Sequence, residues 1–305
     1  MIYTVTLNPG LDRTLTVPEI VHNEVLRATT VRIDLGGKGL NVSRALKALG
    51  SNSVAMGFVG GSNGLLMKRG LREIGIRTDF VCVRGETRIS TLIVDKEAQE
   101  HIKVNEPGPI ILMDEQEALV QKIRKRLKPG DFWAFCGSLP LGLPSNFYAM
   151  LIRLVQAGGA KAVLDTSGDA LREGVKATPY LLKPNLLEIE QATGITVGTE
   201  ADAFIALETL LNLGVQYVAL SMGANGLMIG RKGEIRGIKP PKVPVRSTVG
   251  AGDSTLAGIL WAMSKNMALD EVARWGVATG TAAVMCEGTG VGDQALVESI
   301  YGLLK

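Results

Sequence analysis

A run of small residues near the end of the chain delivers a carboxylate to the start of an expected helix. The run reads Ser247-Thr248-Val249-Gly250-Ala251-Gly252-Asp253-Ser254. Backbone N–H groups around Gly250, Ala251 and Gly252 can approach an anion closely, and Asp253 can accept a proton beside it. This pairing suits phosphoryl transfer to a hydroxyl. Taken alone, the run is better explained by a glycine turn followed by an aspartate that caps the helix.

A second glycine-rich turn, Leu35-Gly36-Gly37-Lys38-Gly39-Leu40-Asn41-Val42, leads into another expected helix. Its glycines permit close backbone approach, and Lys38 adds a positive charge suited to a phosphate. It is not a Walker loop, because the four-residue spacer and the final Lys-Ser or Lys-Thr pair are missing. Arg88 could join Lys38 in clamping a substrate phosphate if its segment folds over this turn. A solvated lysine and a surface ion pair are the alternatives.

Polar residues also follow three expected strands, in the segments Asn8–Asp12, Gly137–Pro140 and Ser221–Gly226. Asp12 could hold sugar hydroxyls or form an Asx turn. Ser138 could contact a substrate or simply belong to a turn. Ser221, Gly223 and Gly226 could line the phosphates of a nucleotide or join a hairpin.

The segment Lys183-Pro184-Asn185-Leu186-Leu187-Glu188 places an amide and a carboxylate three residues apart at a helix start, on one face. Oxygen ligands of this kind suit magnesium, so Asn185 and Glu188 could bind the ion directly or through water. Reciprocal capping of the helix explains the same spacing.

The elements that must position these residues alternate between β-branched apolar runs and helical patterns. This alternation predicts an α/β fold with a mostly parallel sheet covered by helices on both faces. The expected strands are Ile2–Leu7, Ser53–Phe58, Phe80–Val83, Phe132–Cys136, Ala162–Asp165, Tyr180–Leu182 and Tyr217–Ser221. The expected helices include Asn41–Leu49, Leu65–Ile74, Glu115–Arg126, Ser145–Ala157, Ala201–Leu213, Ser254–Met263 and Leu269–Cys286.

Two stretches interrupt this alternation, at approximately residues 14–34 and 86–107. Each alternates apolar and polar residues without a helix and predicts an antiparallel ribbon that projects from the main sheet. The ribbons could form a lid over a site, and their exposed faces could pair two chains into a homodimer. No repeat or linker divides the rest, so residues 1–305 are expected to form a single domain.

Composition limits the function classes. The chain has 46% hydrophobic residues and a net charge of only +3 with scattered basic residues, so neither nucleic acid nor a membrane surface is the expected partner. The chain has only two histidines, so a zinc site built from histidine ligands is not expected. The three cysteines lie in apolar runs and are expected to be buried, reduced thiols. Without a signal-peptide or membrane-spanning pattern, a cytoplasmic protein is expected.

In this order and at these separations, the motifs resemble the ribokinase-like PfkB family of carbohydrate kinases. The resemblance covers nearly the whole chain and implies a three-layer α/β/α core with a small β lid. The segments around Asp12, Arg88, Ser138 and Asp253 resemble the branch that acts on phosphorylated ketohexoses. That branch implies ATP-dependent phosphorylation of fructose 1-phosphate to fructose 1,6-bisphosphate, with tagatose 6-phosphate and fructose 6-phosphate as alternative substrates.

The resemblance also implies a role for each residue. Asp253 would be the base, near its ordinary pKa, and Gly250, Ala251 and Gly252 would bind the phosphoryl group in transfer. The remaining assignments are sugar binding by Asp12, Gly37, Asn41 and Ser138, phosphate binding by Lys38 and Arg88, contacts to magnesium and the ATP phosphates by Lys183, Asn185 and Glu188, and nucleotide contacts by Ser221, Gly223 and Gly226.

A potassium ion could bind carbonyls of Ser247, Val249 and the Glu287–Gly292 loop, as it does in members of the family. Two other classes stay open. A sensor that binds a sugar phosphate or nucleotide without catalysis would not need a base and metal ligands together. A dehydrogenase is disfavoured because no Gly-x-Gly-x-x-Gly follows the first strand.

Overall fold

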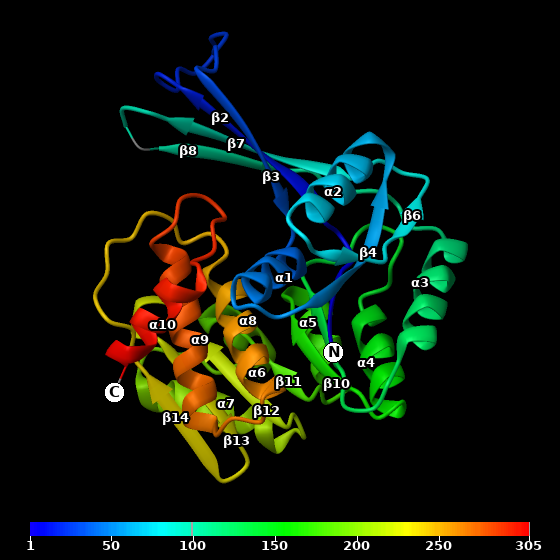
Figure 1. Cartoon of the computed structure of the whole chain (residues 1–305), viewed down its shortest axis with the longest axis vertical. Coiled ribbons are helices and arrows are strands. Elements are labelled where there is room, and N and C mark those ends of the chain that lie inside the picture. The colour runs from blue at the N-terminus through cyan, green and yellow to red at the C-terminus, as the bar shows by residue number, and fades with distance from the viewer. Residues whose placement is uncertain (99, 305) are drawn as a thin grey trace.

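A large, mostly parallel β-sheet forms the centre of the molecule (Figure 1). The structure is a computed structural model that describes residues 1–98 and 100–304. The strands of this sheet are β1 (Ile2–Thr6), β4 (Ser53–Gly60), β5 (Arg77–Thr78), β6 (Val81–Val83), β9 (Phe132–Cys136), β10 (Lys161–Asp165), β11 (Leu181–Leu182), β12 (Tyr217–Ser221), β13 (Leu227–Arg231) and β14 (Glu234–Ile238). Their order is β14-β13-β12-β11-β10-β9-β1-β4-β5, with β6 also pairing with β4.

Parallel pairing runs from β12 to β5, and only β13 and β14 pair antiparallel at one edge. The inner strands carry apolar residues on both faces, as in the fully buried β1 and β9. Such strands require helices on both sides, because neither face can be left to water.

The helices supply these two outer layers. They are α1 (Lys38–Ala48), α2 (Gly61–Glu73), α3 (Met113–Arg126), α4 (Phe147–Ala157), α5 (Gly168–Val175), α6 (Leu186–Thr193), α7 (Glu200–Asn212), α8 (Ala251–Ser264), α9 (Leu269–Val284) and α10 (Gln294–Leu303). One buried apolar cluster joins the sheet to α3, α4, α5, α6 and α7, and another joins it to α1, α8, α9 and α10. The expected three-layer α/β/α architecture is therefore confirmed.

A separate four-stranded sheet extends outward from this core (Figure 1). It consists of β2 (Gly10–Val17), β3 (Thr30–Gly36), β7 (Arg88–Asp95) and β8 (His101–Asn105), in the order β3-β2-β7-β8. We call it the small sheet. The two expected ribbons are its antiparallel pairs β2–β3 and β7–β8, and a parallel pairing of β2 with β7 joins them. Sequence reasoning did not anticipate this joining, because it pairs residues 78 positions apart along the chain, such as Gly10 with Arg88.

The structure also differs from the sequence-based expectations in one helix and one cysteine. Helix α5 was not predicted, because Gly168 and Gly174 lower the helix propensity of its eight residues. Cys82 is exposed rather than buried, because it is the outward-facing residue of β6, between the buried Val81 and Val83. Cys136 is buried, and Cys286 is partly exposed. Within residues 1–98 and 100–304, no helix is both long and apolar enough to cross a membrane.

Candidate active site

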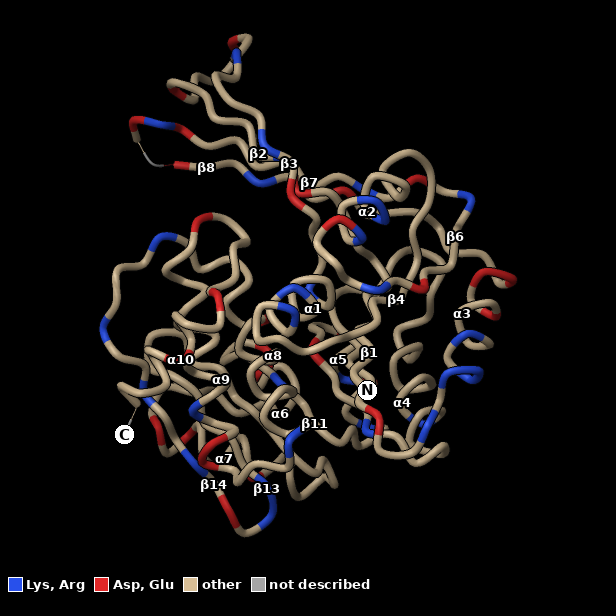
Figure 2. Tube along the Cα trace, viewed as in Figure 1, with Lys and Arg blue, Asp and Glu red and all other residues tan. Residues whose placement is uncertain are grey.

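An open cleft with a volume of about 860 Å³ lies at the carboxyl edge of the large sheet. Figure 2 shows Lys and Arg spread over the outer helices and the small sheet, with Asp and Glu among them. Parallel strands end together at one edge, which is where such sheets bind ligands. The cleft brings together eleven of the residues expected from the sequence: Lys38, Lys183, Asn185, Glu188, Ser221, Gly223, Gly226, Gly250, Ala251, Gly252 and Asp253.

The small-residue run forms the start of α8 and one wall of this cleft. Gly250 has a left-handed backbone with φ 80°, which favours glycine, and it is the residue that precedes the first helical turn. Ala251, Gly252 and Asp253 form that turn. Because the first N–H groups of a helix have no partner within the helix, this turn can bind an anion.

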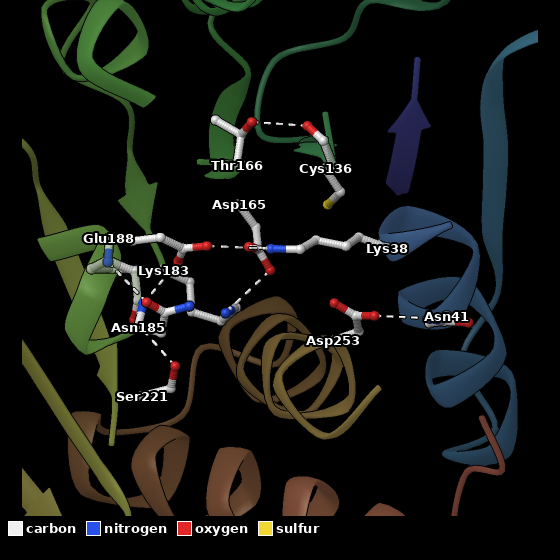
Figure 3. A network of polar contacts seen from close by, with 12 residues as sticks. Lys38, Asn41, Cys136, Asp165, Thr166, Lys183, Asn185, Glu188, Ser221 and Asp253 are labelled. Atoms are coloured by element: carbon white, nitrogen blue, oxygen red, sulfur yellow. Dashed lines mark hydrogen bonds and ion pairs between the residues drawn. The ribbon is translucent and has the colours of Figure 1, made fainter. Parts of the chain in front are cut away.

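Asp253 is buried, with 7% of its surface exposed, and is held by a residue from another helix. Nδ2 of Asn41, in α1, donates a hydrogen bond of 2.8 Å to Oδ2 of Asp253 (Figure 3). The sequence led us to expect Asn41 at the sugar hydroxyls. In the structure its amide nitrogen orients the carboxylate, so Asn41 contacts the expected base directly.

Two lysines and two further carboxylates form a network beside Asp253 that is buried apart from the partly exposed Lys38 (Figure 3). Nζ of Lys38 lies 2.7 Å from Oδ1 of Asp165 and 3.7 Å from Oε1 of Glu188. Nζ of Lys183 lies 3.2 Å from Oδ2 of Asp165. Asp165 ends β10 and its side chain is fully buried. The site is therefore organised around a carboxylate that sequence reasoning did not single out.

The signal for Asp165 was present in the sequence. It is an acidic residue that ends a buried apolar strand, and strands of this kind place polar residues at the ligand-binding edge of a parallel sheet. Nothing in the local sequence, however, indicated which two lysines would meet it.

The charges of this network set two pKa values in opposite directions. Burial alone would raise the pKa of Asp165, but the charges of Lys183 and Lys38 outweigh it and hold this pKa below its usual range. Burial raises the pKa of Asp253 to about 6, and the charge of Asp165 adds to the rise. The hydrogen bond from Asn41 acts in the opposite direction. The expectation that Asp253 keeps an ordinary pKa is therefore wrong.

Asn185 and Glu188 cap α6 at the opposite wall. Oδ1 of Asn185 accepts from the N–H of Glu188, and Oε2 of Glu188 accepts from the N–H of Asn185, each at 2.8 Å. The capping explanation is thus realised in the structure, and Oε1 of Glu188 is the oxygen left to face Lys38. In the part of the chain that the structure describes, no three or more His, Cys, Asp or Glu side chains converge as a ready-made metal site.

Backbone geometry accounts for the two glycines expected at the nucleotide. Gly223 and Gly226 have φ values of 57° and 94°, and a Cβ at Gly226 would lie 2.0 Å from the carbonyl oxygen of Ile238. Ser221 ends β12 and donates from Oγ to the carbonyl of Pro184 at 3.2 Å. Apolar residues from the loop before α8 and from α9 complete this end of the cleft: Val243, Val245, Val277 and Val284.

The remaining expected residues lie outside the lining of this cleft. Asp12 is on β2 and packs so closely on Gly36 that a Cβ there would lie 2.4 Å from its Oδ2. Arg88, on β7, donates to the carbonyls of Asn8 and Glu106 at 3.2 and 3.1 Å. Lys38 and Arg88 therefore have different partners in the structure.

Gly37 and Ser138 also lie beside the cleft rather than in its lining. Gly37 precedes α1 with φ 135°, and a Cβ there would lie 3.0 Å from the Cγ2 of Thr6. Ser138 is exposed after β9, and its Oγ lies 3.5 Å from the Nδ2 of Asn8.

Comparison with known proteins agrees with this geometry. Residues 7–295 match the family model described as pfkB family carbohydrate kinase. The chain belongs to this family. It is 34% identical over 290 residues to the 1-phosphofructokinase of Bacillus subtilis (strain 168), covering 95% of this chain and 94% of that one. It is 36% identical over 284 residues to the 1-phosphofructokinase of Rhodobacter capsulatus, covering 93% and 90%.

The fold of the chain is also similar to that of a solved phosphofructokinase structure. Phosphofructokinase-2 from Escherichia coli in complex with potassium superposes with a TM-score of 0.94 at 28% identity, covering 99% of this chain and 98% of that one. The expected ribokinase-like fold and kinase class are therefore confirmed.

The opposing effects on the carboxylates can be tested directly. In protein carrying 13C-labelled aspartate carboxyl groups, the signal that Asp253→Asn removes should titrate with a midpoint of about 6. Asn41→Ala should raise that midpoint, because it removes a hydrogen bond to the ionised form. Asp165→Asn should lower it, because it removes a nearby negative charge. Shifts of both variants in the same direction would contradict this account of the network.

Proposed function

We propose that this protein is a 1-phosphofructokinase, which transfers the γ-phosphoryl group of ATP to the 6-hydroxyl of fructose 1-phosphate. The observation that carries the proposal is the position of Asp253, a buried carboxylate of raised pKa at the N-terminus of α8, facing a cleft that also holds two lysines. The names of the curated relatives support the choice of fructose 1-phosphate. Tagatose 6-phosphate and fructose 6-phosphate are the alternative acceptors.

Asp253 acts as the base in this proposal. It takes the proton of the acceptor hydroxyl while the oxygen attacks the γ-phosphorus and ADP leaves. A pKa of about 6 leaves most of the carboxylate ionised at pH 7 and brings its basicity nearer to the working pH. The N–H groups of Gly250, Ala251 and Gly252 bind the phosphoryl oxygens during transfer.

The acceptor sugar lies between the core and the small sheet in this proposal. Asp12, Gly37, Asn41 and Ser138 surround its hydroxyls, and Arg88 binds the phosphate that it already carries. We assign Lys38 to phosphate binding as well. Its ammonium lines the cleft beside Asp165, whereas Arg88 lies outside the lining of the cleft, so Lys38 would be the nearer of the two to the transferred group.

The nucleotide occupies the other half of the cleft. Lys183 contacts its phosphates, while Ser221, Gly223 and Gly226 line its path toward the apolar end. Asn185 and Glu188 fit magnesium in the way the ion is commonly bound, by one or two oxygen side chains together with substrate phosphates and waters. Bound there, magnesium would neutralise charge on the ATP phosphates.

A potassium ion fits the segment before α8. The N–H groups of Arg246 and Ser247 donate to the carbonyl of Val284 at 2.8 and 3.2 Å, so this segment runs beside the end of α9. The guanidinium of Arg246 also lies 3.6 Å from Oε1 of Glu287, the first residue of the loop Glu287–Gly292. Carbonyls of Ser247, Val249 and that loop would coordinate the ion. The solved complex of Escherichia coli phosphofructokinase-2 with potassium supports this assignment.

We further propose that residues 1–305 act as one kinase domain and that the small sheet is both a lid and a dimer interface. Its register aligns Val31, Leu15, Ile93 and Ile102 in one row across all four strands, on a single face. Val31 is 62% exposed and Ile102 is 40% exposed. Nearer the core, Leu11 of the same face is buried against α2. A second copy would cover the uncovered part of this face.

The central test is Asp253→Asn, assayed by ADP production against fructose 1-phosphate, tagatose 6-phosphate and fructose 6-phosphate. Wild type should prefer fructose 1-phosphate, and the variant should lose about 10²- to 10⁴-fold in kcat. Its fold should be at least as stable at pH 7, because a raised pKa means that the ionised carboxylate destabilises the folded state. A folded variant with most of its activity would overturn the role of the base. Binding without ADP production by wild type would indicate a sensor.

Arg88→Ala should raise the KM for the sugar phosphate by at least about tenfold, the effect of losing a charged hydrogen bond, and change the KM for ATP much less. Arg84→Ala is the matched control, because Arg84 lies on the surface and pairs with Asp114. Equal effects of Arg88→Ala on both substrates would contradict its assignment to the sugar phosphate.

Ile102→Glu combined with Val31→Glu should convert the dimer to a monomer, because four like charges would face one another across the two-fold axis. Sedimentation velocity measures the change. Leu65→Glu, at a residue of α2 that is 67% exposed, is the control and should leave the dimer intact. A wild-type monomer, or a variant that remains a dimer, would refute this interface.

A further inference from the structure

A second cavity, of about 230 Å³, opens at the edge of the large sheet opposite to the active-site cleft. A water molecule occupies about 30 Å³ in the liquid, so this cavity has room for roughly eight waters or one small ligand. Its lining comes from the starts of β10 and β12, the residue before β11, the end of β13, and the connection between α8 and α9.

Side chains from neighbouring strands form one wall of this cavity. Lys161 starts β10, Tyr180 precedes β11, Tyr217 starts β12 and Arg231 ends β13, in the same order as the strands lie in the sheet. The rings of Tyr180 and Tyr217 are 5.1 Å apart between centroids. Four strands therefore present two cations and two phenols side by side.

The phenols and one cation lie close together. Tyr217 packs beside Tyr180 and lines the same wall of the cavity as Arg231. Burial raises the pKa of Tyr180 to about 12, so this hydroxyl remains protonated and able to donate at neutral pH. Arg231 pairs with Glu234 at 2.8 Å, which leaves other N–H groups of its guanidinium for a ligand.

Lys161 has no such partner. Its Nζ lies 4.7 Å from the ring centroid of Phe132 and 5.0 Å from that of Tyr180, and within residues 1–98 and 100–304 it forms no ion pair or side-chain hydrogen bond. Aromatic faces hold a cation in place but supply no acceptor for its three N–H donors. Among the residues that the structure describes, no carboxylate lines the cavity. The cavity therefore offers positive charge and hydrogen-bond donors without a negatively charged acceptor of its own, and an anion is the ligand that would complement them.

Two helices separate this cavity from the active-site cleft. Helix α8 carries Asp253 in its first turn, at the cleft, and ends at Ser264, two residues before Asn266 in the lining of the cavity. Helix α9 runs in the opposite direction, from Leu269 at the cavity to Val284 at the cleft. A helix of 14 residues such as α8 is about 21 Å long. A ligand in the cavity could not contact the nucleotide or the sugar.

We propose that this cavity is a second binding site, for a small phosphate-bearing anion held by Lys161, Arg231 and the hydroxyls of Tyr180 and Tyr217. Phosphate accepts several charge-assisted hydrogen bonds at once, and the guanidinium and ammonium groups supply them on one side of the cavity.

Methionine methyl groups offer a local probe of this site. The chain has ten methionines; Met263 and Met267 line the cavity and none lines the active-site cleft. In full-length protein carrying 13C-methyl methionine, the signals of Met263 and Met267 should shift saturably on titration with inorganic phosphate and with phosphoglycolate. Sodium chloride at matched ionic strength controls for non-specific screening. Stronger binding of phosphoglycolate would identify an organic phosphate as the ligand, and stronger binding of inorganic phosphate would identify the free ion.

Lys161→Gln and Arg231→Gln should each weaken this binding about tenfold, the effect of losing a charged hydrogen bond. Lys265→Gln is the matched control, because Lys265 also stacks on an aromatic ring, 3.6 Å from the centroid of Trp261, but does not line the cavity. It should bind phosphate as wild type does. Kinase activity of all three variants reports that they are folded. Absence of a saturable shift up to about 50 mM phosphate, or equal weakening by Lys265→Gln, would overturn the site.

Discussion

The ion network around Asp165 is the constraint on which the active site depends. A fully buried carboxylate is tolerated only when its charge is compensated, and Lys38 and Lys183 provide that compensation from two different segments of the chain. The effect of this network extends to Asp253. Burial raises the pKa of Asp253 from 3.8 to about 6, and the negative charge of Asp165 adds to this rise, which corresponds to about 3 kcal/mol against the ionised form. Asp165 therefore helps to produce the basicity of Asp253.

That arrangement requires α1 and α8 to be fixed relative to each other, since one helix carries Lys38 and Asn41 and the other carries Asp253. Nε1 of Trp261, in α8, donates to the carbonyl of Leu49 at the end of α1 at 3.0 Å. Gly258 lets α8 approach α9 so closely that a Cβ there would lie 2.4 Å from the carbonyl oxygen of Trp275. The small-residue turn is thus the partly exposed end of a helix that is buried along most of its length.

These contacts explain how much of the molecule could be predicted from the sequence. Strands β9 and β12 were predicted to the residue, because continuous apolar runs between turn signals leave few alternatives. The turn before Asp253 was found because its chemistry lies in consecutive residues. Asp165 was missed because its importance comes from lysines far away along the chain, and sequence spacing contains no information about that meeting. For the same reason the sequence could not show that Asn41 would bond to Asp253.

In the proposed dimer, the small sheet would serve both the sugar site and the interface between the two copies. Strand residues alternate between faces, so the register that places Leu15 and Ile93 on one face places Asp12 and Ser90 on the other. Arg32, which shares the face of Asp12, packs against Gly288 in the loop after α9, so this polar face is turned toward the core. The apolar face must then point away from the site. A partner bound to that face would hold the sheet, and with it Asp12, over the cleft, and assembly of the proposed dimer would then be coupled to formation of the proposed sugar site.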